Sequence, residues 1–387
     1  MTFPLKLYEH QKRFLLRNPD KALLSHECST GKTLIGALWL QSRDSHAFVI
    51  CPLRVVDKWR DQLKEVGTKA TVLTKEQFKK TEIIDPSALF VDECHHFSSP
   101  LFTRQRSQLS ERLYALVQKY PRMPIVLATA TPIRSSPANL HSLLCFTGQY
   151  IPWKQWRDAF YTLERRPYLA RPAWFPKKNW RITIRGVLKK YADIVLLRDC
   201  VAELPKEEEL IVQVKCERFQ RQTEWEPMRA FVEEHRHEQK NKAKKILELS
   251  EGYRKVMVAV HFREHMEELE KELSKHRQTY VVHGNTKNAE EVIRMAEADG
   301  ECFLLAQASL GEGWKAPSFR VIIFSSMNYS YVSLVQMKGR IAAIGSHVLP
   351  SRFYFLIGGR CDKGIMERLR LGKSFDPRYW LKEYGDF

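Results

Sequence analysis

The sequence predicts an α/β protein with two doubly wound parallel sheets, one in each half of the chain. Short apolar runs alternate with helical stretches in both halves, which is the pattern of strands buried on both faces. A glycine-containing loop joins the first of these runs to a helix. The runs lie near residues 22, 48, 72, 90 and 127, and then at 211–214, 256–260, 279–282, 302–306, 321–324 and 353–357.

The loop after the first run reads SHECSTGKT and spans residues 25–33. Such a loop points successive backbone N–H groups at one place on the positive end of a helix, where a phosphate can bind. Gly31 allows close approach of the backbone, Lys32 can reach the outer phosphates, and the Thr33 hydroxyl can ligate magnesium. The phosphate-loop pattern would have glycine where this chain has His26.

An acidic pair follows the apolar run at 88–91. In ALFVDECHHF, residues 88–97, Asp92 and Glu93 stand at the carboxyl end of the expected strand. Ligands bind at that edge of open parallel sheets. We therefore expect the pair to meet magnesium and a water molecule.

Three other segments have a distinct character. Residues 3–17 are expected to form a short amphipathic helix, and ELPKEEE at 203–209 is read as a linker between domains 1–205 and 206–387. Residues 148–182 mix Trp, Tyr and Phe with Arg and Lys and contain four prolines, so we expect an irregular insertion. Its aromatic residues either stack on bases or pack the insertion onto the first domain. Both interpretations remain open from the sequence.

Composition indicates the class of partner. Lys and Arg number 63 against 45 Asp and Glu, a net charge of +18, which favours a polyanion such as nucleic acid, although an anionic membrane surface would suit the same balance. The eight cysteines are scattered without a C-x-x-C pair, which argues against zinc and disulfides. No signal-peptide core or membrane-spanning run is visible, so we expect a cytoplasmic protein that is monomeric and not membrane-bound.

These motifs, taken in order, resemble superfamily-two helicases and translocases, and within them the Swi/Snf-type ATPases and their compact phage relatives. The resemblance covers nearly the whole chain. Its segments are Gln11 behind Tyr8 and His10, ECSTGKT (motif I), CPLRVVDKW (Ia), DECH (II), TATPIRSSPANLHSLL (III), LLRDCVAELP, VMVAVHFREHMEELEKEL (IV), LGEGWKAPSFRVIIF (V), QMKGRIAAIGS (VI) and GRCDKGIMERL.

The resemblance implies two tandem RecA-like lobes with ATP and Mg²⁺ in the cleft between them. Lys32 would contact the phosphates, Thr33 and Asp92 the metal, and Glu93 the attacking water, while Arg340 would face the γ-phosphate. The implied nucleotide-binding residues are Gln11, Ser29, Thr30, Gly31, Lys32, Thr33 and Gly313. Nucleic acid, most simply double-stranded or branched DNA, would lie across both lobes, and the insertion would contribute Arg165, Arg166, Lys177 and Lys178.

Two departures from the family pattern bear on activity. His26 and Ser29 replace small, acidic or glycine residues of the loop, which a site built on backbone N–H groups tolerates. Motif VI carries Arg340 but has Ala343 in place of its second arginine, and a supplied arginine can be worth about 10³ in rate.

The expected activity is that of an ATP-dependent DNA translocase or helicase. The alternatives are an ATP-gated nucleic-acid clamp with weak hydrolysis and an RNA-directed enzyme of the same superfamily.

Overall fold

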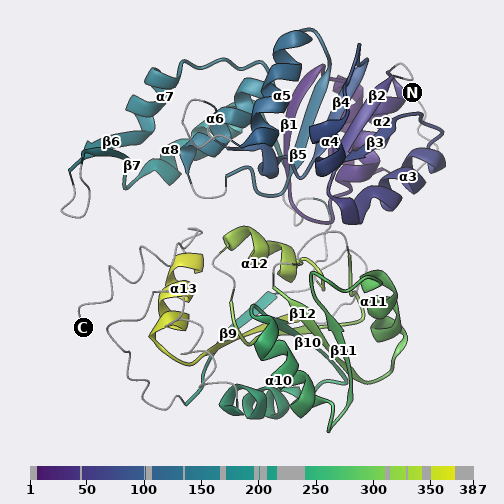
Figure 1. The fold of residues 1–387 in the computed structure, drawn as a ribbon, viewed down its shortest axis with the longest axis vertical. Coiled ribbons are helices and arrows are strands. Elements are labelled where there is room, and N and C mark those ends of the chain that lie inside the picture. Colours follow the sequence, from purple (N-terminus) through teal and green to yellow (C-terminus); the bar gives the residue numbers. More distant parts are fainter. Residues whose placement is uncertain are drawn as a thin grey trace. The chain divides into compact units, whose positions relative to one another are not determined.

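The computed structural model describes residues 7–43, 46–99, 101, 107–133, 136–165, 171–195, 200, 207–215, 240–308, 310, 314–327, 330–341 and 350–370. They belong to two compact units, Met1–Ala202 and Glu203–Phe387 (Figure 1). Each unit holds a six-stranded parallel sheet with helices, so the predicted α/β class with two parallel sheets is confirmed. Within the described ranges, no helix has the length and apolarity that crossing a membrane requires.

The sheet of the first unit has the strand order β3-β2-β4-β5-β1-β8. All five strands expected in this half are present, and β8 at the edge was not expected. β8 pairs in parallel with β1, from Leu23 opposite Ala192 to His26 opposite Val195. The strands are β1 (Lys21–His26), β2 (Ala47–Cys51), β3 (Thr71–Thr74), β4 (Ala88–Asp92), β5 (Ile125–Thr129) and β8 (Ala192–Val195).

Consecutive residues of these strands point to opposite faces of the sheet, and each face has its own core. Leu23 and Leu127 belong to one apolar cluster, whereas Leu24 and Val126 belong to the other. Helices α1 (Glu9–Arg17), α2 (Lys32–Gln41) and α3 (Val56–Glu65) cover the second face. The first face is covered by α4 (Lys75–Lys80), η2 (Cys94–Phe97), α5 (Gln108–Lys119), α6 (Pro137–Phe146), α7 (Trp153–Phe160) and α8 (Trp180–Tyr191). A 3-10 turn, η1 (Leu53–Val55), precedes α3.

The second unit repeats this design with the strand order β11-β12-β10-β13-β14-β9. Its strands, all six of them expected, are β9 (Glu207–Gln213), β10 (Lys255–Val260), β11 (Gln278–Val282), β12 (Cys302–Gln307), β13 (Val321–Phe324) and β14 (Ser351–Ile357). The helices are α10 (Arg263–Leu273), α11 (Ala289–Ala298), α12 (Tyr331–Lys338), α13 (Arg360–Arg370) and a helix whose described part is 240–250. The last two are joined by a buried ion pair, Lys242 Nζ to Asp362 Oδ2 at 2.9 Å.

The interpretation of 203–209 as a linker is wrong for its last three residues. Glu207, Glu208 and Glu209 begin β9 and pair with β14. The charges are accommodated because β9 is an edge strand with neighbouring cations. Lys338 Nζ contacts the carboxylates of Glu207 and Glu209, and Arg352 Nε lies 2.7 Å from Glu208 Oε2.

The expectation of an irregular insertion is also wrong. Helix α7 leads into an antiparallel hairpin of β6 (Tyr161–Glu164) and β7 (Ala173–Pro176), and α8 follows. Trp156, Phe160 and Trp180 are buried in the core of the first unit. The regular structure follows from these anchors, since their apolar area stabilises α7 and α8 against the sheet-covering helices. Packing therefore accounts for most aromatic residues of the insertion.

Candidate nucleotide site

The loop between β1 and α2 is braced by the side chain of Gln11. Gln11 Nε2 donates to the Thr30 carbonyl at 3.2 Å, and Gln11 Oε1 accepts from the Tyr8 N–H at 2.9 Å. His10 Nε2 lies 3.0 Å from the same carbonyl. Gly31 has φ of +81°, and a Cβ there would lie 2.3 Å from Gln11 Nε2. Position 31 therefore requires glycine both for its left-handed backbone and for the close approach of Gln11.

Lys32 and Thr33 form the first turn of α2, at its positive end. Lys32 Nζ donates to the carbonyls of His26 and Glu27, both at 3.0 Å, so the ammonium lies over the loop. Ser29 has φ of +67°, a backbone that glycine adopts without strain. This conformation explains why the family pattern favours glycine at that place.

The phosphate-loop pattern has glycine where this chain has His26. A residue other than glycine is tolerated there because His26 is the last residue of β1 and its φ is not positive. Its ring is fully buried, and Nε2 lies 3.3 Å from Asp193 Oδ1 on β8. Arg13 and Arg17 of α1 contact the same carboxylate, each at 3.3 Å. Burial lowers the pKa of His26, and Asp193 partly opposes that shift. His26 thus joins the loop to the edge strand that sequence reasoning missed.

Replacing Asp193 with alanine should destabilise the protein by about 1–3 kcal/mol, because a buried ring nitrogen of His26 loses its partner. Urea unfolding of the full chain measures this. Asp158→Ala is the matched control, since Asp158 is half-exposed and pairs with its neighbour Arg157; it should cost no more than about 0.5 kcal/mol. Equal stability of the two variants would show that Asp193 does not hold His26.

Asp92 ends β4 as a buried carboxyl group. Trp59 Nε1 donates to Asp92 Oδ2 at 2.9 Å, and the Glu93 N–H donates to Oδ1 at 3.0 Å. Burial and the neighbouring Glu93 charge raise the pKa of Asp92 to about 6, while Trp59 and the charge of Lys32 act in the opposite direction. Strands β1 and β4 both pair in parallel with β5, so the Lys32 loop and Asp92 lie at the same edge of the sheet.

Glu93 has φ of +47° and is held by two side chains. His95 Nδ1 lies 3.1 Å from Glu93 Oε2, and the Thr129 hydroxyl donates to the same oxygen at 3.4 Å. His95 Nδ1 and Thr129 Oγ1 are 3.0 Å apart. The N–H of Thr131 donates to Thr129 Oγ1 at 3.1 Å. The end of β5 thus fixes the orientation of the second carboxylate.

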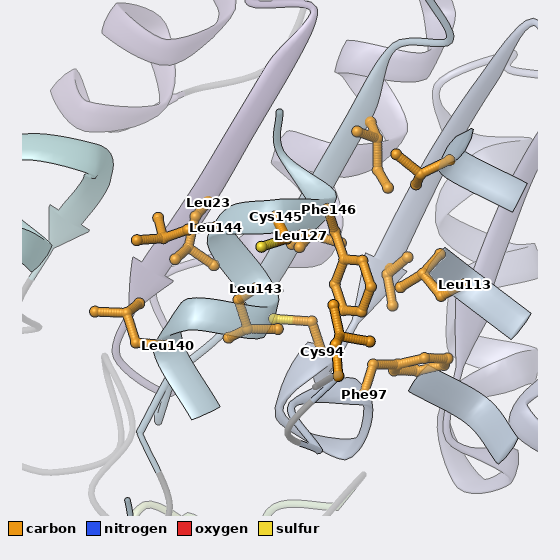
Figure 2. Packing of buried hydrophobic residues seen from close by; sticks show 14 of the residues in the cluster. Leu23, Cys94, Phe97, Leu113, Leu127, Leu140, Leu143, Leu144, Cys145 and Phe146 are labelled. Atoms are coloured by element: carbon orange, nitrogen blue, oxygen red, sulfur yellow. The ribbon is translucent and has the colours of Figure 1, made fainter. Parts of the chain in front are cut away.

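Helix α6 packs against one face of the sheet, next to the acidic segment. Figure 2 shows Leu143 and Leu144 of α6 packed near Leu127 of β5, with Cys94 and Phe97 of η2 in the same cluster. Asn139 Nδ2 donates to the Ser98 carbonyl at 2.8 Å, directly after η2. The acidic segment therefore rests on a buried apolar layer, and such packing is what holds a site in a fixed geometry.

Arg340 lies in the second unit and is 9% exposed. Its Nε donates to the Gln336 carbonyl at 3.0 Å and its Nη1 to the Trp314 carbonyl. The guanidinium also lies over the Trp314 ring, 5.6 Å from its centroid. The structure thus joins the segment that resembles motif VI to the one that resembles motif V. Gly313 and Ala343 lie outside the described residues.

Comparison with known proteins finds similarity to helicase domains. Residues 238–345 match the helicase conserved C-terminal domain. The Hef helicase domain of Pyrococcus furiosus shares the fold at 12% identity and a TM-score of 0.53, covering 93% of this chain and 97% of that one. Residues 238–345 are thus similar to a helicase C-terminal domain, and the chain as a whole has the fold of the Hef helicase domain. A Sulfolobus solfataricus SWI2/SNF2 ATPase core in complex with dsDNA aligns at 13% identity, with 98% and 95% coverage and a TM-score of 0.44. A comparison with curated proteins gave no match.

Within this helicase fold, sequence reasoning missed several site residues. Trp59 stands in the segment that resembles motif Ia, but no role was given to it. His95 and Thr129 stand in the segments that resemble motifs II and III, and the stretch ADIV at 192–195 gave only a weak signal for β8 because Asp193 interrupts it. Of the predicted nucleic-acid residues, Arg165 and Lys178 are exposed, Lys177 Nζ donates to the Asp158 carbonyl at 2.8 Å, and Arg166 lies outside the described residues.

Proposed function

We propose that this protein is an ATP-dependent DNA translocase or helicase, which couples ATP hydrolysis to movement on duplex or branched DNA. The observation that carries the proposal is the shared site of Lys32, Asp92 and Glu93 at one sheet edge. An open parallel sheet binds its ligand there, and the N-terminus of α2 supplies N–H groups for phosphate.

The residues present suit ATP and magnesium. Lys32 and the loop N–H groups would bind the phosphates, and Thr33 with Asp92 would hold the metal. Bound magnesium would neutralise charge on the phosphate oxygens. Burial and the neighbouring charge of Glu93 both disfavour the ionised form of Asp92. A bound cation would therefore stabilise the ionised carboxylate.

Glu93 is the residue proposed to orient the attacking water. His95 and Thr129 both bind its Oε2, which fixes the plane of the carboxylate. A fixed carboxylate orients water at low entropic cost, and catalysis of phosphoryl transfer is mainly positioning and charge neutralisation. The proposal that Arg340 contributes charge to the γ-phosphate stays a prediction.

The choice of DNA rests on the Swi/Snf-like segments, and the net charge of +18 supports a polyanion. One experiment separates the candidates: ATP turnover with single-stranded, duplex, forked and four-way-junction DNA, beside the corresponding RNA. Stimulation by duplex or branched DNA is the expected result. Preferential stimulation by RNA would indicate that the protein moves on RNA and not on DNA. Tight ATP-dependent binding with little turnover would favour the clamp, which the alanine at position 343 permits.

A further inference from the structure

The β6–β7 hairpin presents an apolar face that its unit does not cover. Figure 1 shows the hairpin beyond α7 and α8, at the end of the first unit away from the sheet. Tyr161 pairs with Pro176, and Leu163 pairs with Trp174. Since alternate residues of a strand share a face, these two pairs form one continuous surface.

The surface begins in the core and ends in solvent. Tyr161 is buried at 9% exposure, whereas Trp174 is 43% and Leu163 is 56% exposed. The Tyr161 hydroxyl accepts from the Ala138 N–H at 3.1 Å and contacts the Ser136 hydroxyl, both at the start of α6. A lone two-stranded hairpin is marginally stable in water. These bonds anchor its base, so the exposed pair stands on a fixed support.

One cation lies against the exposed pair, and others belong to the same segments of the chain. The guanidinium carbon of Arg157, on α7, lies 4.3 Å from the centroid of the Trp174 ring. The Asp158 carboxylate accepts from Arg157 Nε at 2.9 Å and from Nη2 at 2.8 Å, which orients the guanidinium. Residues 153–165 and 171–178 contain six cations and two acids. The cations are Lys154, Arg157, Arg165, Arg171, Lys177 and Lys178, and the acids are Asp158 and Glu164.

We propose that the Trp174–Leu163 face stacks on an unpaired nucleobase, and that Arg157 and the other cations of these segments hold its phosphates. The inference rests on the proposed function for the presence of nucleic acid, and it names the structure recognised: a single strand or an opened end, not an intact duplex. In the interior of a duplex, both faces of each base are covered by its neighbours. Only an unstacked base can pack on the indole.

Size and charge favour this occupant over a protein. Stable protein interfaces bury about 1,600 Å² in total, far more than one Trp–Leu pair supplies. A single base stacked on an aromatic side chain contributes about 1–3 kcal/mol, which such a pair can provide. The excess of cations in residues 153–165 and 171–178 suits a phosphate backbone. It would repel a basic partner and would leave an apolar one with desolvated charges.

The test is Trp174→Ala in the full chain, with Tyr150→Ala as matched control. Tyr150 is a 68% exposed aromatic residue outside the hairpin. Binding of labelled oligothymidylate, a forked duplex and a blunt duplex of equal length is measured by fluorescence anisotropy. Trp174→Ala should weaken single-strand and fork binding by about 5- to 150-fold, the range that the stacking energy implies. Blunt-duplex binding, and all binding by Tyr150→Ala, should change less than about twofold, since neither involves the stacked base.

An abasic oligonucleotide provides a second arm. The wild type should bind it as weakly as Trp174→Ala binds the intact strand, while the variant should not distinguish the two. Trp174→Phe should retain most of the affinity because it keeps an aromatic face. Unchanged single-strand affinity in Trp174→Ala, or an equal loss on single strands and blunt duplex, overturns the stacking proposal. A wild-type protein that binds none of the DNA probes, nor their RNA counterparts, would instead refute the proposed function.

Discussion

Lys32→Ala should abolish ATP hydrolysis and leave the fold intact. The ammonium donates to the carbonyls of His26 and Glu27 in the loop itself, and Lys32 belongs to neither core cluster of its unit. Its removal therefore takes away a cation from the phosphate site without opening a cavity. Loss of one such charge from a preorganised site costs about 10²–10³ in rate or more.

Turnover at saturating nucleic acid, together with a thermal melt, checks this prediction. Lys12→Ala is the control, because Lys12 is an exposed lysine of α1 paired on the surface with Glu9. It should keep normal turnover.

Glu93→Gln should complement the result by binding ATP without hydrolysing it, since the amide can still occupy the position but cannot activate water. Near-normal turnover in Lys32→Ala or in Glu93→Gln would refute the assignment of this loop and acidic pair.

The strands were predictable because their signal is local. Runs such as AFVIC at 47–51 and CFLLA at 302–306 are apolar throughout, which a strand covered on both faces requires. Strand β8 lacks that signal, since Asp193 interrupts it and Ile194 is 38% exposed. The start of β9 was missed for a similar reason, because its three glutamates do not form an apolar run. They are tolerated since an edge strand needs only one covered side, and cations from α12 and β14 compensate the charges.

The sequence predicted the site residues only where they belong to motifs at the ends of expected strands. Lys32 and Asp92 follow strands whose carboxyl ends meet at one sheet edge, so their proximity follows from topology. The bond from Trp59 to Asp92 joins residues 33 positions apart, and the contact of His26 with Asp193 spans 167 positions. No local pattern encodes such pairs. In the insertion, composition identified the mixture of aromatic and basic residues, but only the fold separates buried Trp156 from exposed Trp174.

Asp92→Asn should abolish hydrolysis and at the same time stabilise the protein. Burial and the Glu93 charge raise the pKa of Asp92 to about 6 from its ordinary 3.8. The folded state therefore binds this proton more tightly than the unfolded state does. Stability is lost as pH rises through the window from about 4 to 6, and it stays lower above that window.

Asparagine removes the ionisation and keeps nearly the same shape. Its carbonyl oxygen can still accept from Trp59 Nε1, so the core around Phe90 should not change, whereas its amide nitrogen replaces the oxygen that accepts from the Glu93 N–H. The loss of that bond offsets part of the gain. Relief of the buried charge should raise the free energy of unfolding by about 1–3 kcal/mol above pH 6, or the melting temperature by roughly 2–4 °C per kcal/mol. Near pH 4, where the aspartic acid is protonated in the folded state, the gain should vanish.

Thermal melts of both proteins between pH 4 and 8 measure the gain, with Asp57→Asn as control. Asp57 is 88% exposed and pairs with Arg60 on the surface of α3, so its replacement should change stability by no more than about 0.5 kcal/mol. A gain confined to high pH, combined with lost turnover, would mean that the fold tolerates a destabilising carboxylate at the end of β4 for the sake of its chemistry. An Asp92→Asn protein that is less stable than the wild type at pH 7 would show that the carboxylate is a structural hydrogen-bond acceptor instead.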